Sequence, residues 1–454
     1  MKKIIVILFI FTACLCRAYA SDSYVPVRAG ISDTSFKTYV YDSIEFINAY
    51  TLQVIDAPTG SMVPIDAGSR VLKAVFENGA FSIFIDGELK ARGFSGPVIV
   101  YSKDGITGIK GLKRKGKQAY YRGYIELVPS SKDASKFSAV NVLSMKDYLR
   151  GVVPNEMPVR FGLEALKAQA VAARNYAAAP RVKAYQEFDV CDSVACQVYY
   201  GANTEDELSD RAVEETDGII AADKDNQPIL ALYSSTAGGC TESYSLAFSD
   251  PLTREFPSKD IYYLHAVPDN PEFEPFDTDE KAAAFYNSRP ESFDDMSPYY
   301  RWTKEWTKSE LEQVLNKTMP AQSKTGFIYP AVNTGENIGH LLSIRALQRG
   351  ASGKIAKLEI KTDKNTYIVQ KELVIRRCFQ KNGISLPSAN FVISYINSSA
   401  PVFKFTGGGF GHGIGLSQWG AGKMASMGYT FDEILKHYYT GIELIKYTKL
   451  KEAQ

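Results

Sequence analysis

The chain has 454 residues, of which 45% are hydrophobic and 23% are charged, and its formal net charge is +1. These values are ordinary for a folded globular protein, and the balanced charge gives no electrostatic basis for binding nucleic acid or an anionic membrane surface. After the N-terminal segment no apolar run is long enough to span a bilayer, and the length predicts two or three domains.

The first twenty residues have the pattern of a secretory signal peptide. Lys2 and Lys3 precede the apolar run 4–13, and Ala18-Tyr19-Ala20 places small residues where a signal peptidase reads them. We therefore predict cleavage after Ala20. Lipid attachment at Cys14 and an uncleaved N-terminal anchor are the two alternatives. In each case the body of the protein works outside the cytoplasm, in the periplasm or the cell-wall space.

Residues 21–138 are expected to form a β-rich region, which we interpret as a scaffold or a glycan-docking platform. Alternating apolar and polar residues predict strands that are separated by the turns Asn78-Gly79, Asp86-Gly87 and Asp104-Gly105. The predicted strands are residues 25–31, 71–76, 81–85, 97–101 and 120–128.

The composition changes near residue 139, and residues 139–445 are expected to form a region of mixed α/β class, followed by a tail at 446–454. A strand at 139–143 leads into a helix that Ser144 caps and that ends at Gly151. A polar excursion is expected at about 250–298. The other predicted helices are 163–179, 309–317, 372–380 and 431–438, and the other predicted strands are 219–222, 229–233, several between 344 and 369, and 442–447.

Glu156 is the candidate general acid. Pro154 and Pro158 stiffen the segment that carries it, because proline fixes its own backbone and biases the preceding residue toward extended geometry. Apolar neighbours favour the protonated form of a carboxyl group, as a general acid requires. The alternative is a surface glutamate that caps the following helix.

Two further acids compete with Glu156. Glu164 lies in the first turn of a predicted helix, where the helix dipole favours a carboxylate, so a structural role explains it. Glu242 follows the turn Gly238-Gly239, where it could line a cleft. It is the weaker second candidate.

The segment 407–421 contains six glycines between Gly407 and Gly415. Because glycine weakens strands and helices, these glycines indicate a close approach of the backbone to a ligand or to another segment. We interpret the segment as a cleft wall, in which His412, Ser417, Gln418 and Trp419 contact sugar hydroxyls and a sugar ring. The alternative is a tight internal crossing with His412 as a hydrogen-bonded core residue.

Cys191 and Cys196 are spaced for a metal site or a local disulfide. Zinc needs further ligands, and no histidine stands beside the pair. We therefore predict no metal and no other cofactor, with the disulfide left open.

Several motifs resemble the SpoIID/LytB family of stage II sporulation proteins. They occur in the order of the family from about residue 139 to 445, so the resemblance implies one catalytic domain over residues 139–445. The matching segments are Tyr148–Pro158, Glu164–Tyr176, Cys196–Tyr199, Ser235–Gly239, Ser297–Trp302, Gly411–Ala421 and His437–Gly441.

The resemblance implies a lytic transglycosylase that cleaves peptidoglycan glycan strands, preferably strands without stem peptides, to 1,6-anhydro ends. It places the catalytic acid at Glu156. One carboxyl group suffices, because it protonates the glycosidic oxygen and then accepts a proton from the sugar's 6-hydroxyl. The expected substrate-contacting residues are Gln197, Tyr199, Ser235, Gly238, Gly239, His412, Gly413, Ser417, Gln418 and Trp419.

The resemblance also implies an alternative that is not an enzyme. Some relatives bind and stimulate a cell-wall amidase, and this function needs a glycan-facing cleft without needing Glu156. The expected partners are therefore glycan strands and, in the alternative, an amidase. Some relatives bind zinc through cysteines and a histidine, and this chain departs from that pattern at Cys191 and Cys196.

Overall fold

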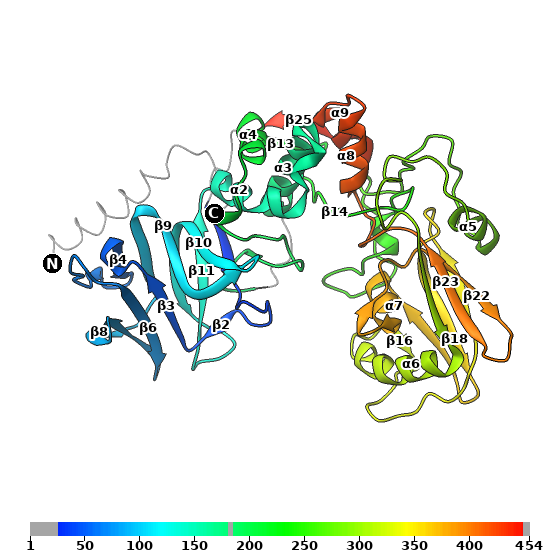
Figure 1. The fold of residues 1–454 in the computed structure, drawn as a ribbon, viewed down its shortest axis with the longest axis horizontal. Coiled ribbons are helices and arrows are strands. Elements are labelled where there is room, and N and C mark those ends of the chain that lie inside the picture. The colour runs from blue at the N-terminus through cyan, green and yellow to red at the C-terminus, as the bar shows by residue number, and fades with distance from the viewer. Residues whose placement is uncertain (1–25, 180–184, 448–454) are drawn as a thin grey trace. The chain divides into compact units, whose positions relative to one another are not determined.

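The structure is a computed structural model that describes residues 26–179 and 185–447. The predicted signal peptide and the end of the predicted tail, residues 448–454, lie outside the described residues. The chain divides into two compact units. Unit 1 extends to Ile220 and resumes at Ile445, and unit 2 is Ala221–Leu444. Both contain helices and sheets, which confirms the mixed α/β class (Figure 1).

Unit 1 is built on one large sheet. Its strand order is β12-β1-β11-β10-β9-β3-β6-β7-β8, with β2 beside β11, β4 beside β9 and β5 beside β4. The strands are β1 (Val27–Ile31), β2 (Val40–Tyr41), β3 (Ser43–Ile47), β4 (Leu52–Asp56), β5 (Ser61–Met62), β6 (Val71–Glu77), β7 (Ala80–Ile85), β8 (Glu88–Phe94), β9 (Val98–Arg114), β10 (Lys117–Pro129), β11 (Phe137–Leu143) and β12 (Val190–Cys191).

Two of the three predicted hairpin turns are confirmed. Asn78 and Gly79 join β6 to β7, and Asp86 and Gly87 join β7 to β8, all four with the positive φ that two-residue turns of this kind require. The third prediction is wrong, because Asp104-Gly105 lies inside the long strand β9. Gly105 has a φ of 77° there, so the backbone bends without ending the strand.

The position 138/139, where we expected the catalytic domain to begin, falls inside β11. Every residue of this strand is buried, and it pairs with both β1 and β10. The strand therefore belongs to the centre of unit 1. The break between the compact units comes later, after Ile220.

Three α-helices of unit 1 pack together: α2 (Met145–Glu156), α3 (Leu163–Ala178) and α4 (Glu207–Glu215) (Figure 1). The predicted cap of α2 is confirmed, since the Ser144 hydroxyl accepts a hydrogen bond of 3.1 Å from the backbone N–H of Asp147. Short 3-10 turns lie nearby at Val159–Phe161 and Ala202–Thr204.

The predicted end of α2 at Gly151 is wrong. The helix continues through Pro154 and ends at Glu156. Gly151 is needed for packing, because a Cβ atom there would lie 2.5 Å from the ring of Tyr199. Met157 ends the helix with an extended φ of −120° and ψ of 131°, as a residue before Pro158 is expected to do.

Unit 2 contains several smaller sheets, with orders β15-β23-β22, β16-β19-β18-β17, β14-β24 and β20-β21. The strands are β14 (Tyr233–Ser234), β15 (Trp302–Thr307), β16 (Ile328–Tyr329), β17 (Leu341–Arg349), β18 (Ile355–Thr362), β19 (Thr366–Gln370), β20 (Gln380–Lys381), β21 (Ile384–Ser385), β22 (Phe391–Ile396), β23 (Val402–Gly407) and β24 (Leu416–Ser417). β13 (Ile219–Ala222) and β25 (Glu443–Lys446) lie where the chain passes from one unit to the other.

The helices of unit 2 are α5 (Asp279–Tyr286), α6 (Lys308–Ser323), α7 (Glu372–Cys378), α8 (Gln418–Ser426) and α9 (Phe431–Tyr438). The predicted helix 309–317 is present, but α6 is longer and accommodates Pro320. Of the predicted strand 229–233, only Tyr233 belongs to a strand. Within the described residues, no helix is long and apolar enough to cross a membrane.

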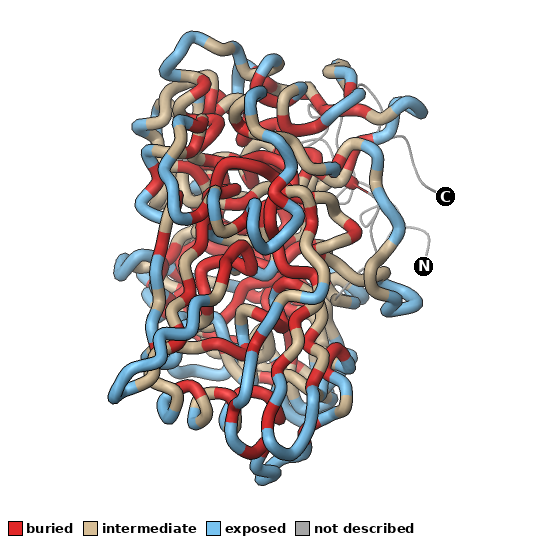
Figure 2. The backbone as a smooth tube through the Cα atoms, turned by 90° about the vertical axis from the view of Figure 1, so that its right-hand side faces the viewer, coloured by how far each residue is buried: buried red, intermediate tan, exposed pale blue. Residues whose placement is uncertain are grey.

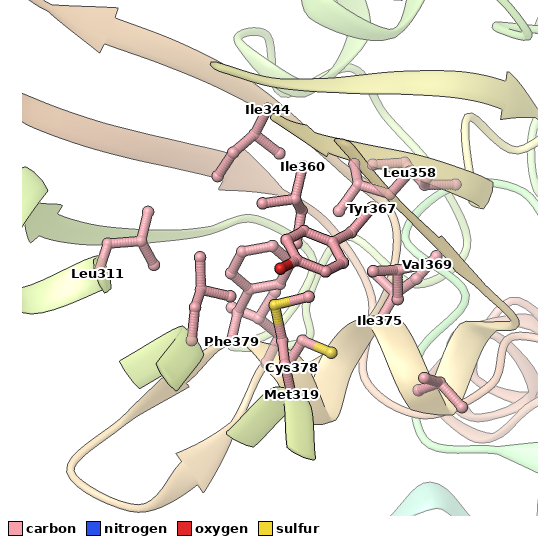
Figure 3. Packing of buried hydrophobic residues seen from close by; sticks show 14 of the residues in the cluster. Leu311, Met319, Ile344, Leu358, Ile360, Tyr367, Val369, Ile375, Cys378 and Phe379 are labelled. Carbon is pink, nitrogen blue, oxygen red and sulfur yellow. The ribbon is translucent and has the colours of Figure 1, made fainter. Parts of the chain in front are cut away.

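The main core of unit 2 lies between α6, α7 and the sheet containing β17–β19. Figure 3 shows Leu311 and Met319 of α6 facing Ile360, Tyr367 and other residues of this sheet. These side chains are all buried. Burial of apolar area at this scale is the main stabilising contribution to such a unit.

The predicted polar excursion 250–298 is not only a surface feature. It contributes α5 and the fully buried residues Asp294 and Ser297. Figure 2 shows the general pattern, in which exposed residues gather in the outer loops and buried residues run through the interior. Two buried acids of this segment, Asp269 and Asp294, are hydrogen-bonded to the turn Gly238-Gly239 of unit 2.

Candidate functional site

Glu156 lies half-buried at the last residue of α2. Its Oε1 accepts a hydrogen bond from the backbone N–H of Val198. The preceding residue, Asn155, donates hydrogen bonds of 2.7 Å to the carbonyl of Gly151 and to the hydroxyl of Thr204. The Val198 N–H thus orients the carboxyl group, while the bonds of Asn155 fix the end of the helix that carries it, and Glu156 remains partly exposed.

The segment around Val198 is anchored to the sheet by a buried ion pair. Arg114 and Asp192 form a salt bridge with both side chains fully buried. The carboxylate of Asp192 also accepts hydrogen bonds from the hydroxyl (2.7 Å) and the backbone N–H (3.0 Å) of Ser32. Burial nevertheless raises the pKa of Asp192. Sequence reasoning did not find this pair, because its members are 78 residues apart.

Gln197 and Tyr199 have buried side chains that face the interior of unit 1. Gln197 donates a hydrogen bond of 3.1 Å to the hydroxyl of Tyr148, and Tyr199 donates one of 2.6 Å to the side-chain oxygen of Asn141. The exposed fractions of these two side chains are 0% and 1%. In this structure both residues fix the segment that carries the Val198 N–H.

Cys191 and Cys196 do not form a disulfide in the structure. A hydrogen bond with Cys196, together with the hydroxyls of Ser193 and Tyr39, lowers the pKa of Cys191 to about 5. The two thiols do not fit a zinc site, since structural zinc takes four nitrogen or sulfur ligands. Every histidine of the chain lies in unit 2, and no cluster of three or more His, Cys, Asp or Glu side chains among the described residues is arranged for a metal.

In unit 2 the segments 233–239 and 407–420 cross each other closely. β14 and β24 pair in parallel, and Thr236 forms an antiparallel bridge with Phe410. A Cβ atom on Gly238 would lie 2.8 Å from the backbone of Gly408 and Gly409. The glycines therefore serve a backbone crossing, which is the alternative to the cleft wall that we preferred from the sequence.

His412 is part of this crossing. Its Nδ1 accepts a hydrogen bond of 3.0 Å from the backbone N–H of Ile414, and its ring lies edge-on to Phe248. Burial, followed by the nearby charges of Lys354 and Arg376, lowers the pKa of His412 to about 3. The imidazole is therefore uncharged at neutral pH, and it is a hydrogen-bonded residue of the crossing that remains partly exposed.

The other predicted residues of this segment are brought together. The Ser417 hydroxyl caps α8 and accepts a hydrogen bond of 3.3 Å from the backbone N–H of Ala237. Trp419 donates its backbone N–H to the carbonyl of Ser235 at 3.0 Å, and both residues are half-buried. Gly413 donates to the hydroxyl of Ser234, and Gln418 is 7% exposed. Ser235 and Trp419 are thus the more accessible of the predicted contacts.

Two buried acids that the sequence did not single out, Asp294 and Asp269, lie at the turn Gly238-Gly239, and the backbone N–H of Asp269 donates to the carbonyl of Gly239 at 2.9 Å. Asp294 accepts a hydrogen bond of 2.6 Å from the backbone N–H of Gly238 and one of 3.0 Å from Ser292. Burial, together with the negative charge of Asp269, raises the pKa of Asp294 to about 7. The polar composition of residues 250–298 predicted a surface segment. For this reason the sequence did not indicate that Asp269 and Asp294 are buried.

The two rival acids have structural roles. Glu164 pairs with Lys167 at 2.8 Å in the first turn of α3. Glu242 is fully buried and accepts hydrogen bonds from Ser352 and from the backbone N–H of Ser243. Burial raises the pKa of Glu242.

Glu156 belongs to unit 1, whereas the crossing belongs to unit 2. The single cleft that we expected from the sequence therefore stays a prediction. In unit 1 the structure shows one acid held at a helix end. In unit 2 it shows, separately, a crossing of two segments at which Ser235 and Trp419 are half-buried.

Comparison with known proteins supports the resemblance. Residues 133–222 match the family described as stage II sporulation protein (SpoIID), and residues 252–415 match a domain family of unknown function. Stage II sporulation protein D of Bacillus subtilis is 30% identical over 322 residues, which cover 67% of this chain and 76% of that protein. An uncharacterized protein of Brachyspira hyodysenteriae is 27% identical over 361 residues, covering 78% of each chain.

A protein named amidase enhancer, also from Bacillus subtilis, is 29% identical over 310 residues, which cover 66% of this chain and 40% of that protein. The matched region 133–222 contains β11, α2, α3 and the segment around Val198. The fold around Glu156 and the long match to the Bacillus protein lead to one conclusion. This chain belongs to the stage II sporulation protein D family.

Proposed function

We propose that this protein is a lytic transglycosylase that cleaves peptidoglycan glycan strands to 1,6-anhydro ends, with Glu156 as its general acid and base. The observation that carries the proposal is the position of Glu156. Its carboxyl group stands half-buried at the end of α2 and is oriented by the N–H of Val198. A rigid, partly exposed carboxyl group is what proton transfer to a glycosidic oxygen requires.

The chemistry needs only this chain's own side chains. In its protonated form Glu156 donates a proton to the glycosidic oxygen, and the bond to the anomeric carbon breaks. The resulting carboxylate accepts the proton of the sugar's 6-hydroxyl while that oxygen bonds to the anomeric carbon. The acid is thereby regenerated, and no water molecule or cofactor is consumed.

The test uses purified residues 21–454 and soluble glycan strands without stem peptides, with mass spectrometry of the products. Wild-type protein is expected to release anhydro-ended fragments. Glu156→Gln is expected to lower the rate at least about a hundredfold, because general acid catalysis typically contributes that much. Glu164→Gln is the matched control, since Glu164 is a neighbouring glutamate paired with Lys167. Reducing-end products would contradict the transglycosylase mechanism.

A second candidate function is the binding and stimulation of a cell-wall amidase. The relative named amidase enhancer favours this possibility. In this case wild type and Glu156→Gln would bind glycan equally, neither would cleave it, and both would raise the rate of an added amidase.

Both candidate functions place the protein outside the cytoplasm. We base this part of the proposal on the signal-like residues 1–20. Detection of the mature N-terminus at Ser21 by sequencing the protein from cell-wall fractions would test it, and recovery of full-length protein from the cytosol alone would contradict it.

A further inference from the structure

The segment 197–200 alternates between buried and half-buried residues. The side chains of Gln197 and Tyr199 are hydrogen-bonded inside unit 1, whereas Val198 and Tyr200 are half-buried. The two neighbouring tyrosines therefore have different surroundings. Tyr200, which the sequence did not single out, is the tyrosine of this segment that reaches the surface.

Tyr200 is held next to the end of α2. Its backbone N–H donates a hydrogen bond of 3.2 Å to the carbonyl of Gly151, and the N–H of Val198 donates to the carboxyl group of Glu156. Burial raises the pKa of Tyr200, and the negative charge of Glu156 is among the charges that raise it further. The phenol of Tyr200 and the proposed general acid therefore lie within electrostatic range of each other.

A loop of the N-terminal β-rich region brings a second aromatic ring to Tyr200. The ring centre of Phe36 lies 5.8 Å from that of Tyr200, and the two ring planes are inclined at 39°. Phe36 is 36% exposed, and its φ of 58° is a left-handed conformation that bulky residues rarely adopt. Backbone strain of this kind persists only where the surrounding structure enforces it, and it is common at functional sites.

The loop that carries Phe36 is fixed from two sides. The carboxylate of Asp33 accepts a hydrogen bond of 2.7 Å from the backbone N–H of Lys37, which closes the loop on itself. The guanidinium carbon of Arg114 lies 4.6 Å from the ring centre of Phe36. Arg114 is also the partner of Asp192 in the buried ion pair. The same guanidinium group therefore supports both the Phe36 ring and the segment that lies against α2.

The ring of Tyr200 has a second neighbour from the N-terminal region. Lys115 is exposed in the turn between β9 and β10, and its Nζ lies 5.9 Å from the ring centre of Tyr200. Phe36 and Lys115 both lie outside residues 133–222, which match the stage II sporulation protein family. The β-rich region thus places side chains of its own near the end of α2.

We propose that Tyr200 and Phe36 form an aromatic contact for one sugar ring of the glycan strand next to Glu156. The inference rests on the proposed glycan substrate. A sugar ring presents C–H groups on its faces and hydroxyls at its edge, so a partly exposed aromatic pair can pack against a face while the hydroxyls stay hydrogen-bonded. A contact with one ring restricts how the strand lies across the end of α2. It thereby positions the glycosidic oxygen for proton transfer.

Phe36→Leu and Tyr200→Leu test this contact, because leucine keeps an apolar side chain and removes the ring. Binding of a soluble, peptide-free glycan fragment to residues 21–454 is measured by calorimetry in the Glu156→Gln background, where no cleavage interferes. Each substitution is expected to raise the dissociation constant about three- to tenfold, the range of one aromatic contact. Tyr200→Phe keeps the ring and is expected to stay within about twofold of the parent protein.

Tyr50→Leu is the matched control. Tyr50 is 52% exposed in the turn Ala49–Thr51, on a different loop of the same sheet. Its substitution is expected to leave the dissociation constant unchanged. A loss of binding as large as that of Tyr200→Leu would overturn the assignment, because any exposed ring of unit 1 would then have the same effect.

Kinetics with Glu156 intact distinguish a substrate contact from a structural role. Phe36→Leu and Tyr200→Leu are expected to raise KM and to lower kcat, because the strand binds more weakly and lies less well oriented. A substitution that only destabilised the fold would reduce the fraction of active protein without changing KM. Phe36 makes no backbone bond to α2, so Phe36→Leu decides the question if Tyr200→Leu disturbs the segment.

The outcomes separate this inference from the proposed function. Unchanged dissociation constants in Phe36→Leu and Tyr200→Leu would overturn the aromatic contact while cleavage by Glu156 still stood. Weaker binding in both variants, combined with a wild-type protein that releases no cleavage products, would uphold the contact and refute the transglycosylase. If wild-type protein neither binds nor cleaves the fragment, both proposals fail.

Discussion

The carboxyl group of Asp294 accepts a hydrogen bond of 2.6 Å from the backbone N–H of Gly238. One buried acid thus holds the glycine turn that crosses the segment around Gly408. Titratable or charged side chains that interact with it include Asp269, Cys240, Tyr300, Arg301 and Tyr438. Asp294 and Asp269 are both buried in unit 2, with exposed fractions of 0% and 1%.

This pair predicts that unit 2 loses stability as the pH rises. The pKa of Asp294 is about 7 in the folded protein and 3.8 in a solvated chain, so the folded state binds the proton more tightly. The stabilising contribution is complete below pH 4 and is lost as the pH rises through 7. Because one pKa unit corresponds to about 1.4 kcal/mol, the loss is on the order of a few kcal/mol. Melting temperatures between pH 4 and pH 9 measure it.

Asp294→Asn is expected to flatten this pH profile. Asparagine keeps an oxygen for the N–H of Gly238 and cannot ionise. The exposed Asp277→Asn is the control and should leave the profile unchanged. A wild-type melting temperature for unit 2 that is constant from pH 4 to pH 9 would show that the folded state does not raise the pKa of Asp294.

Glu156→Ala and Glu156→Gln are expected to differ in structure although both remove the acid. Glutamine retains an oxygen that accepts from the N–H of Val198, whereas alanine leaves that N–H without its acceptor. A hydrogen bond to a charged group contributes about 1.5–3 kcal/mol. Amide hydrogen exchange at Val198 should therefore accelerate tenfold or more in Glu156→Ala only. Equal acceleration in both variants would show that the charge, rather than the acceptor, holds the segment.

Asp192→Ala is expected to destabilise unit 1 by about 3–5 kcal/mol, because it leaves the buried guanidinium of Arg114 without its counter-charge. Glu88→Ala is the matched control. Glu88 pairs with Lys90 on the surface, where solvent screens the ion pair, so its removal is expected to change stability little. Urea unfolding measures both variants, and similar losses of stability in the two would refute the role assigned to the buried pair.

Gly415→Ala is expected to disrupt the crossing of unit 2. Its φ is 70°, and a Cβ atom there would overlap the carbonyl oxygen of Leu232. Gly335 has a comparable φ of 84° with open space around it. Gly335→Ala therefore isolates the cost of backbone strain, about 1–2 kcal/mol. Thermal unfolding should show a clearly larger loss for Gly415→Ala, and equal losses would mean that the crossing relaxes around the methyl group.

Local patterns in the sequence predicted the elements that depend on local contacts. The hairpins at Asn78-Gly79 and Asp86-Gly87 and the cap at Ser144 were identified because adjacent residues specify them. Gly151 was misread as a helix end for the opposite reason. Its purpose is a contact with Tyr199, and nothing in the neighbouring residues indicates that ring.

The candidate site, like the fold, was predicted only where local residue patterns indicate it. Glu156 and the glycine segment were singled out because their residue types are unusual at those positions. The support from Asp294 and the anchor Asp192 were missed, because each depends on residues that are distant in the sequence. Polar side chains in a polar segment give no signal of burial, so only the folded structure distinguishes Asp294 from a surface acid.

The parallel pairing of β14 with β24 determines when unit 2 can complete its fold. The hydroxyl of Ser234 and the N–H of Gly413 that meet there are 179 residues apart. During synthesis or export the segment 233–239 therefore cannot pair with its partner until nearly the whole chain is available. Contacts between residues so far apart in the sequence form slowly. A chain that stops before residue 407 lacks the partner strand altogether. Unit 2 is consequently a poor candidate for dissection by C-terminal truncation.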